Sequence, residues 1–186
     1  MSPESTILAA ICLPLAGALA IGLAGRVHPN LRESVTMVTA GALAWLVWSL
    51  LPLLMAGGRP AVTISEVMPG LSIAFSVEPL GMLFAALASG LWIVNSIYSI
   101  GYMRGNKEKN QTRFFVCFAL ALSATMGVAF AGNLFTLFLF YELLTLSTYP
   151  LVSHKGDAAT VRSARVYLGV LLTTSIGLFL PAIIWT

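Results

Sequence analysis

Six long apolar stretches, separated by short polar connections, constrain this chain more than any other feature of its sequence. They cover about residues 6–25, 35–56, 80–101, 114–131, 134–153 and 166–185. Each approaches the roughly 20 residues that a helix needs to cross a bilayer, when some tilt is allowed. A water-exposed helix would carry a polar stripe along its length, and these stretches carry almost none. The sequence therefore predicts an all-α polytopic membrane protein with six transmembrane helices.

The composition agrees with this fold class and excludes others. Only 9% of the 186 residues are charged, whereas a soluble domain carries about a quarter. This argues against a soluble globular domain, a disordered chain and a nucleic-acid binder. The six stretches use nearly all of the length, so we predict a single transmembrane domain over residues 1–186. The first stretch lacks a basic region before it and a cleavage site after it, so we interpret it as a retained helix rather than a signal peptide.

Cofactor and metal chemistry find no support in the sequence. The two cysteines, Cys12 and Cys117, both lie inside apolar stretches and have no histidine near them in the sequence. Buried thiols in helices are usually packing residues. The sequence has no phosphate-binding glycine-rich loop, no CxxC pair and no histidine-rich segment. We therefore expect no cofactor and no metal.

The basic residues indicate an orientation in the membrane. Lys and Arg gather in the cytoplasmic connections of membrane proteins. If the amino terminus lies outside the cell, only Arg59 among the 10 basic residues lies on the external side. We therefore predict a multi-pass protein of the cell inner membrane with both termini on the external side.

The connection over residues 57–79 is longer than the others. Residues 71–77 alternate apolar and polar side chains in the manner of a strand, and Pro69-Gly70 is typical of a turn. We expect a small external hairpin between the second and third helices. It would lie on the helix ends, as a lid or as a contact to a neighbouring subunit.

Glu142 is the acidic residue that lies deep in a predicted span. At 1.5 Å per residue it lies about 13 Å from the external end of the fifth helix, near the bilayer centre. A carboxylate at this depth costs several kcal/mol unless it is paired, hydrated or protonated. Thr145 and Tyr149 follow it by three and seven residues and share its helix face. This polar strip must face protein or a water-filled cavity rather than lipid.

Two interpretations of Glu142 compete. In one, a protonated or hydrogen-bonded Glu142 holds helices together. In the other, it takes up and releases protons along a hydrated path, which is favoured because intramembrane ionisable groups are functional as a rule. His154, just after the fifth stretch, could pass protons toward Glu142, although an ordinary interfacial role is favoured because nothing near it in the sequence tunes its titration. Thr173, Thr174 and Ser175 could line a cavity, although helix packing is the commoner role.

Several of these residues resemble one family of membrane proteins. Tyr102-Met-Arg-Gly105, followed after a short charged loop by Arg113-Phe-Phe, resembles the connection after the third helix of the antiporter-like membrane subunits. These subunits occur in respiratory complex I and in Mrp-type multisubunit sodium/proton antiporters. The run from Ala131 to Glu142 resembles their fifth helix, where a Glu follows an aromatic residue. The run from Tyr141 to Val152, with the residues 154–156, is most similar to the D-type branch of the Mrp antiporter subunits.

The resemblance implies a membrane subunit that contributes to proton translocation, in the form of Na⁺/proton antiport, within a multisubunit complex. Its partners would be other membrane subunits, the lipid bilayer, protons and Na⁺. It would be a transporter subunit rather than an enzyme, unless it belongs to a dehydrogenase complex. In the family the fifth-helix Glu is a key residue of the proton path, and Glu142 matches it. That Glu pairs with a lysine on the seventh helix, so this chain is expected to be the amino-terminal part of a longer subunit.

Two alternatives remain open. The chain could instead belong to the proton-pumping membrane part of an NADH:quinone oxidoreductase or a membrane hydrogenase. A third hypothesis, from a different class, is an assembly module that transports nothing and scaffolds its partners through its apolar faces.

Overall fold

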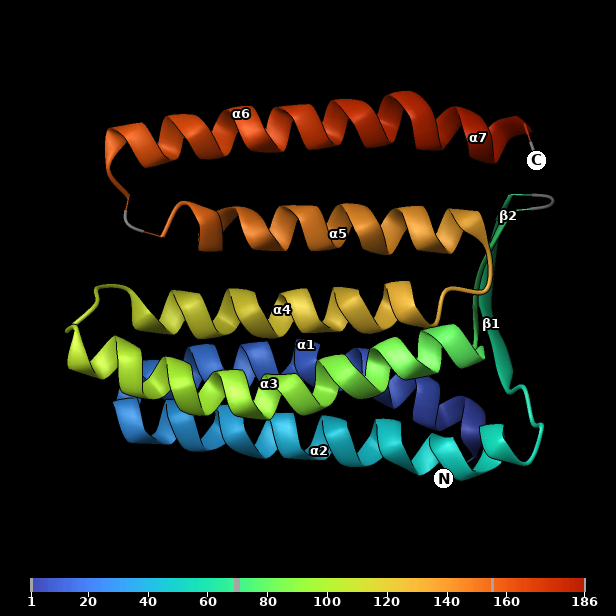
Figure 1. The fold of residues 1–186 in the computed structure, drawn as a ribbon, viewed down its shortest axis with the longest axis horizontal. Coiled ribbons are helices and arrows are strands. Elements are labelled where there is room, and N and C mark those ends of the chain that lie inside the picture. The colour runs from blue at the N-terminus through green and yellow to red at the C-terminus, as the bar shows by residue number, and fades with distance from the viewer. Residues whose placement is uncertain (1, 69–70, 155, 186) are drawn as a thin grey trace.

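The computed structural model describes residues 2–68, 71–154 and 156–185 and shows six long helices lying side by side (Figure 1). Five of them are α1 (Pro3–Val27), α2 (Pro29–Met55), α3 (Pro79–Gly105), α4 (Gln111–Ala129) and α5 (Leu134–Val152). The last consists of three consecutive pieces, α6 (Ala158–Thr174), the π-helix η1 (Ser175–Phe179) and α7 (Leu180–Trp185). All six are long and apolar enough to cross a membrane. The prediction of an all-α, six-span membrane protein is confirmed.

Several helices extend beyond the apolar stretches into the polar connections. α2 begins at Pro29, several residues before the predicted span, because the His28 ring caps it by accepting a hydrogen bond from the Asn30 amide. The sixth helix begins at Ala158, because Asp157 accepts a hydrogen bond from the Thr160 amide. Capping residues, rather than the limits of the apolar runs, decide where these helices start.

A two-stranded antiparallel sheet connects α2 to α3, as the alternating pattern predicts. Its strands are β1 (Ala61–Met68) and β2 (Leu71–Ser76); the predicted Pro69-Gly70 turn lies outside the described residues. The hairpin stands at one end of the bundle, beside the start of α5 (Figure 1). Asn133 Nδ2 donates a hydrogen bond to the Ser72 carbonyl at 2.7 Å, and the Ala74 amide donates to the Thr136 hydroxyl at 3.0 Å. These bonds fasten β2 to α5.

The core lies among α1, α2, α3 and α4, and the last helix lies at the periphery (Figure 1). The Ser123 hydroxyl of α4 donates to the Ile11 carbonyl of α1 at 2.7 Å in the interior of this core. α5 packs against the outer side of α4, and its Phe140 ring meets Phe75 of the hairpin edge-on at 5.4 Å. Half of the most apolar segment of α4 is buried, compared with 6% for the last helix. The last helix is therefore held mainly by α5.

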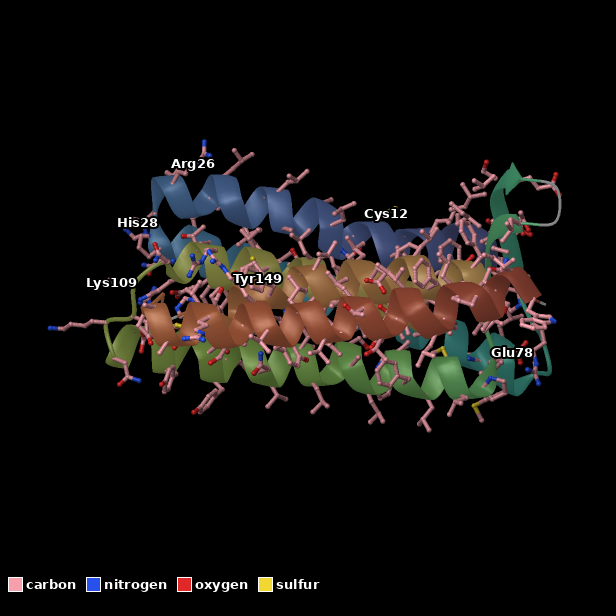
Figure 2. All side chains as sticks on the ribbon, turned by 90° about the horizontal axis from the view of Figure 1, so that it is seen from above. Cys12, Arg26, His28, Glu78, Lys109 and Tyr149 are labelled. Carbon is pink, nitrogen blue, oxygen red and sulfur yellow. The ribbon has the colours of Figure 1, made fainter. Side chains whose placement is uncertain are left out.

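The two ends of the bundle differ in charge. Arg26, His28 and Lys109 lie at one end, and Glu78 lies at the opposite end beside the hairpin (Figure 2). We call these the basic end and the hairpin end. Lys and Arg therefore gather at one end of the helices, as the sequence predicts. Which end faces the cytoplasm stays a prediction.

Candidate functional site

Glu142 lies near the middle of α5, at the depth that its position in the sequence predicts. Asn133 begins this helix by accepting a hydrogen bond from the Thr136 amide at 2.7 Å. Both carboxylate oxygens of Glu142 are buried, and neither has a hydrogen-bond partner among the described residues. A charged carboxylate in such surroundings is costly. The described part of the chain therefore provides no hydrogen bond through which Glu142 could hold two helices together.

The face of α5 that carries Glu142 is turned toward the last helix. Phe138 lies one turn earlier on the same face, and its ring meets the Phe179 ring of η1 edge-on, with centroids 5.9 Å apart. α5 and the last helix run in opposite directions (Figure 1). Counting one turn back from Phe179 therefore brings Ser175 to about the height of Glu142. Ser175 is buried, and its hydroxyl donates to the Leu171 carbonyl at 3.0 Å.

The last helix changes its winding at this height. Over Ser175–Phe179 it is a π-helix, and the Leu180 amide donates to the Ser175 carbonyl five residues earlier. Single π-turns within α-helices are rare and are found frequently at functional sites. Sequence reasoning named Ser175 as a cavity-lining alternative but missed the π-helix. No strong sequence signal predicts it, because the polar residues 173–175 are compatible with an ordinary α-helix.

Thr145 and Tyr149 lie on the same strip of α5 as Glu142, as the helical spacing predicts. Thr145 is buried, and its hydroxyl donates to the Tyr141 carbonyl of its own helix at 3.0 Å. Tyr149 is half-buried and lies toward the basic end (Figure 2). Neither side chain forms a hydrogen bond with the Glu142 carboxylate. Their role as lining of a proton path stays a prediction.

His154 lies just beyond the end of α5 and is not brought into contact with Glu142. Its ring meets the Phe114 ring of α4 edge-on at 5.8 Å, and its carbonyl accepts a hydrogen bond from Arg113 Nη2 at 3.1 Å. Both ring nitrogens are buried without a hydrogen-bond partner in the described ranges. His154 follows Glu142 by twelve positions, ten of them within α5, which corresponds to roughly 15 Å along the helix to its end at Val152. A proton moving between the two side chains would need water or other groups on the way.

Sequence reasoning missed an ion cluster at the basic end. Glu33 of α2 lies 3.0 Å from Arg32 Nη2 and 2.6 Å from Arg104 Nη2 of α3. Arg32 is only 4% exposed, donates to Gln111 Oε1 at 2.9 Å and lies 5.0 Å from the centre of the Phe115 ring. From the sequence, Arg32 served only as a marker of topology, and Arg104 as such a marker and as part of the Tyr102–Gly105 motif. The signal that was available is the adjacent Arg-Glu pair near the start of a span.

Candidate metal ligands do not gather anywhere in the described part of the chain. No group of three or more His, Cys, Asp or Glu side chains there could hold an ion. The residues that the structure makes available for chemistry are therefore the isolated carboxyl group of Glu142, the His154 ring and the ion cluster.

Comparison with known proteins agrees with this architecture. Residues 68–115 match a family described as "NADH-Ubiquinone oxidoreductase (complex I), chain 5 N-terminus". The "Na(+)/H(+) antiporter subunit A1" of Staphylococcus aureus is 28% identical over 161 residues, which cover 85% of this chain and 19% of that protein. The chain is similar in sequence to these antiporter-like membrane subunits. It spans about a fifth of the length of this relative.

Two solved structures share the fold of this chain. A chain of the membrane-bound sulfane sulfur reductase, an archaeal respiratory membrane complex, matches with a TM-score of 0.76 and 16% identity, over 91% of this chain and 36% of that one. A chain of the Mrp complex from Dietzia sp. DQ12-45-1b matches with a TM-score of 0.73 and 20% identity, over 95% of this chain and 33% of that one. The family resemblance is confirmed. The curated relative is a subunit A1, so the D-type branch expected from residues 141–152 and 154–156 is not supported.

Proposed function

We propose that this chain forms part of a membrane subunit that moves protons, coupled to Na⁺ antiport, within a multisubunit complex. Glu142 would be the proton-carrying group, with Thr145, Tyr149 and His154 along its path. The complex would lie in the cell inner membrane, with both termini of this chain outside. The observation that carries the proposal is the Glu142 carboxyl group, buried in the middle of a spanning helix with no hydrogen-bond partner among the described residues.

The chemistry of an unpaired carboxyl group supports a proton carrier. Such a group is neutral when it holds a proton, and a cation that comes within a few Å favours its charged form. A cation that approaches and retreats would therefore make Glu142 release and take up a proton. The described residues place no Lys or Arg against its carboxylate oxygens. On this proposal, the cation comes from outside the residues that the structure describes.

The test is the Glu142→Gln variant of the full-length subunit in its assembled complex. Everted membrane vesicles would be energised, and the collapse of their pH gradient on addition of NaCl would be followed with a pH-sensitive dye. We expect antiport to fall at least about tenfold while the complex still assembles on a native gel. Glu66→Gln, an exposed Glu on the hairpin, serves as the matched control and should transport normally.

The outcomes separate the three hypotheses. Normal antiport by assembled Glu142→Gln complexes would support the assembly module and reject the proton carrier. Proton movement that depends on Glu142 and on NADH or hydrogen, but not on NaCl, would favour the respiratory alternative, which the complex I family match supports. Tyr149→Phe and His154→Gln should lower transport less than Glu142→Gln, because neither side chain contacts the carboxylate.

A further inference from the structure

An open recess of about 500 Å³ lies at the basic end, between the start of α2 and the connection from α3 to α4. The residues that line it include His28, Asn30, Arg104, Lys107, Glu108 and Gln111. The recess is separate from the Glu142 site, which lies near the middle of the bundle on the outer side of α4. Neither the transport proposal nor the family comparison gives it a role.

The recess presents positive charge and hydrogen-bond donors. Its lining includes Arg104, Lys107 and Glu108, and the Arg32–Glu33 pair lies behind Arg104. The three basic side chains outnumber the two carboxylates. Arg104 is held in place by Glu33 and Asn30, yet its side chain is 48% exposed. The arrangement therefore offers a fixed guanidinium group, together with Lys107, to an anion that enters from outside.

The start of α2 adds to this potential. His28 Nδ1 accepts a hydrogen bond from the Asn30 amide at 3.1 Å. In the neutral ring, the proton is therefore on Nε2, which can donate to a ligand. The amino-terminal end of this 27-residue helix also opens at the recess, and helix N-termini carry partial positive charge. The basic side chains and the helix N-terminus therefore both favour an anionic ligand.

The position of the recess favours the headgroup of an anionic lipid over other anionic ligands. α3 has 27 residues, or about 40 Å, and the hydrocarbon core of a bilayer is about 30 Å thick. Arg104 is the second-last residue of α3 and therefore lies at the level of the lipid headgroups. The stacked rings of Tyr98 and Tyr102, 6.0 Å apart on the exposed side of α3, fit the aromatic belt at this level.

An apolar stripe leads along α3 to the recess. Val94, Ile97, Gly101 and Arg104 follow one another at helical spacing on one face. Val94 and Ile97 are 63% and 59% exposed, and a Cβ at Gly101 would meet nothing within 4 Å beyond its own stretch of helix. This stripe can take an acyl chain whose headgroup occupies the recess.

We propose that the recess binds the headgroup of an anionic phospholipid. Arg104, Lys107 and His28 Nε2 donate to the phosphate, and one acyl chain lies along Ile97 and Val94. Phosphatidylglycerol therefore binds in preference to phosphatidylcholine, whose headgroup carries a positive charge into the basic recess.

The test is native mass spectrometry of the complex that contains the full-length subunit, titrated with phosphatidylglycerol or phosphatidylcholine. Lys107→Gln should weaken phosphatidylglycerol binding about fivefold, since one basic residue near an anionic headgroup contributes on the order of that factor. Glu108→Gln should strengthen it. Lys109→Gln is the matched control, because Lys109 points away from the bundle at the same end (Figure 2) and should change binding less than about twofold.

Three results would overturn the proposal. One is equal weakening by Lys107→Gln and Lys109→Gln, which would indicate diffuse surface charge rather than a site. Another is equal binding of the two lipids by the unchanged protein. The last is displacement of bound phosphatidylglycerol by millimolar inorganic phosphate, which would make the recess a site for free phosphate.

Discussion

Replacing Glu33 by glutamine tests whether the ion cluster at the basic end holds α2, α3 and α4 together. Glu33 is 8% exposed and accepts hydrogen bonds from Arg32 Nη2 at 3.0 Å and from Arg104 Nε at 2.8 Å. Arg32 in turn donates to Gln111 and Thr112 of α4. Glutamine keeps the size of the side chain and removes its charge. The buried Arg32 guanidinium then has no counterion within the cluster.

We expect the free energy of unfolding to fall by about 3 kcal/mol. Removing one partner of a buried ion pair costs roughly 3–5 kcal/mol, because the remaining charge stays buried and unpaired. Arg32 accounts for most of this loss. Arg104 is half-exposed, so its pair with Glu33 contributes only about 0–1 kcal/mol. The glutamine oxygen can still accept a hydrogen bond, which places the expected value at the lower end of the range.

Titration with sodium dodecyl sulfate in mixed micelles, followed by tryptophan fluorescence, measures this loss, since Trp92 is buried in the core. Glu66→Gln, on the exposed hairpin, should stay within about 0.5 kcal/mol of the unchanged protein. The double variant Arg32→Met with Glu33→Leu should recover most of the loss, because apolar residues often replace a buried ion pair without cost. If Glu33→Gln unfolds at the same detergent fraction as Glu66→Gln, the cluster does not stabilise the bundle.

Two further substitutions test packing at the hairpin end. Gly81→Ala should lower the free energy of unfolding by about 1–3 kcal/mol, because the added Cβ would clash with the backbone carbonyl of Ala129 in α4. Gly90→Ala in the same helix is the control. Its added Cβ meets nothing within 4 Å, so it should be neutral or stabilising in the same titration. Asn133→Ala removes the cap of α5 and the hydrogen bond from the Asn133 side chain to Ser72. Amide hydrogen exchange in β2 should therefore accelerate about fivefold, while exchange in α3 stays unchanged. Equal acceleration in α3 would contradict a local role.

The sequence predicted those parts of the fold that depend on length and local pattern. Each apolar stretch approaches the length needed to span a bilayer, and that requirement leaves few alternatives for residues 6–25 or 80–101. The alternation in residues 71–77 likewise predicted a strand. The exact start of α2 could not be read from hydropathy, because it depends on the His28 cap within a polar segment. Local hydrogen bonds decide such boundaries.

Contacts between distant residues could not be predicted. Glu33 and Arg104 are 71 residues apart, and their pairing follows from the way α2 and α3 lie together. The depth of Glu142 in the membrane is a property of one helix, so the sequence alone predicted it. The lack of a partner for its oxygens, and the π-helix near its height on the last helix, depend on packing between helices. Those two features required the structure.

Two buried carboxyl groups of this fold, those of Glu33 and Glu142, have very different surroundings. Glu33 lies where α2, α3 and α4 meet and has two Arg partners. Glu142 lies on α5 with no hydrogen-bond partner in the described chain. A charged carboxylate that is buried without a partner is destabilising, whereas the Glu33 carboxylate has its charge balanced. Only 6% of the most apolar segment of the last helix is buried, so this helix, which covers one side of α5, is little enclosed by the rest of the chain. On the proposed function, the group that balances Glu142 would therefore reach it on the side of α5 that the last helix covers.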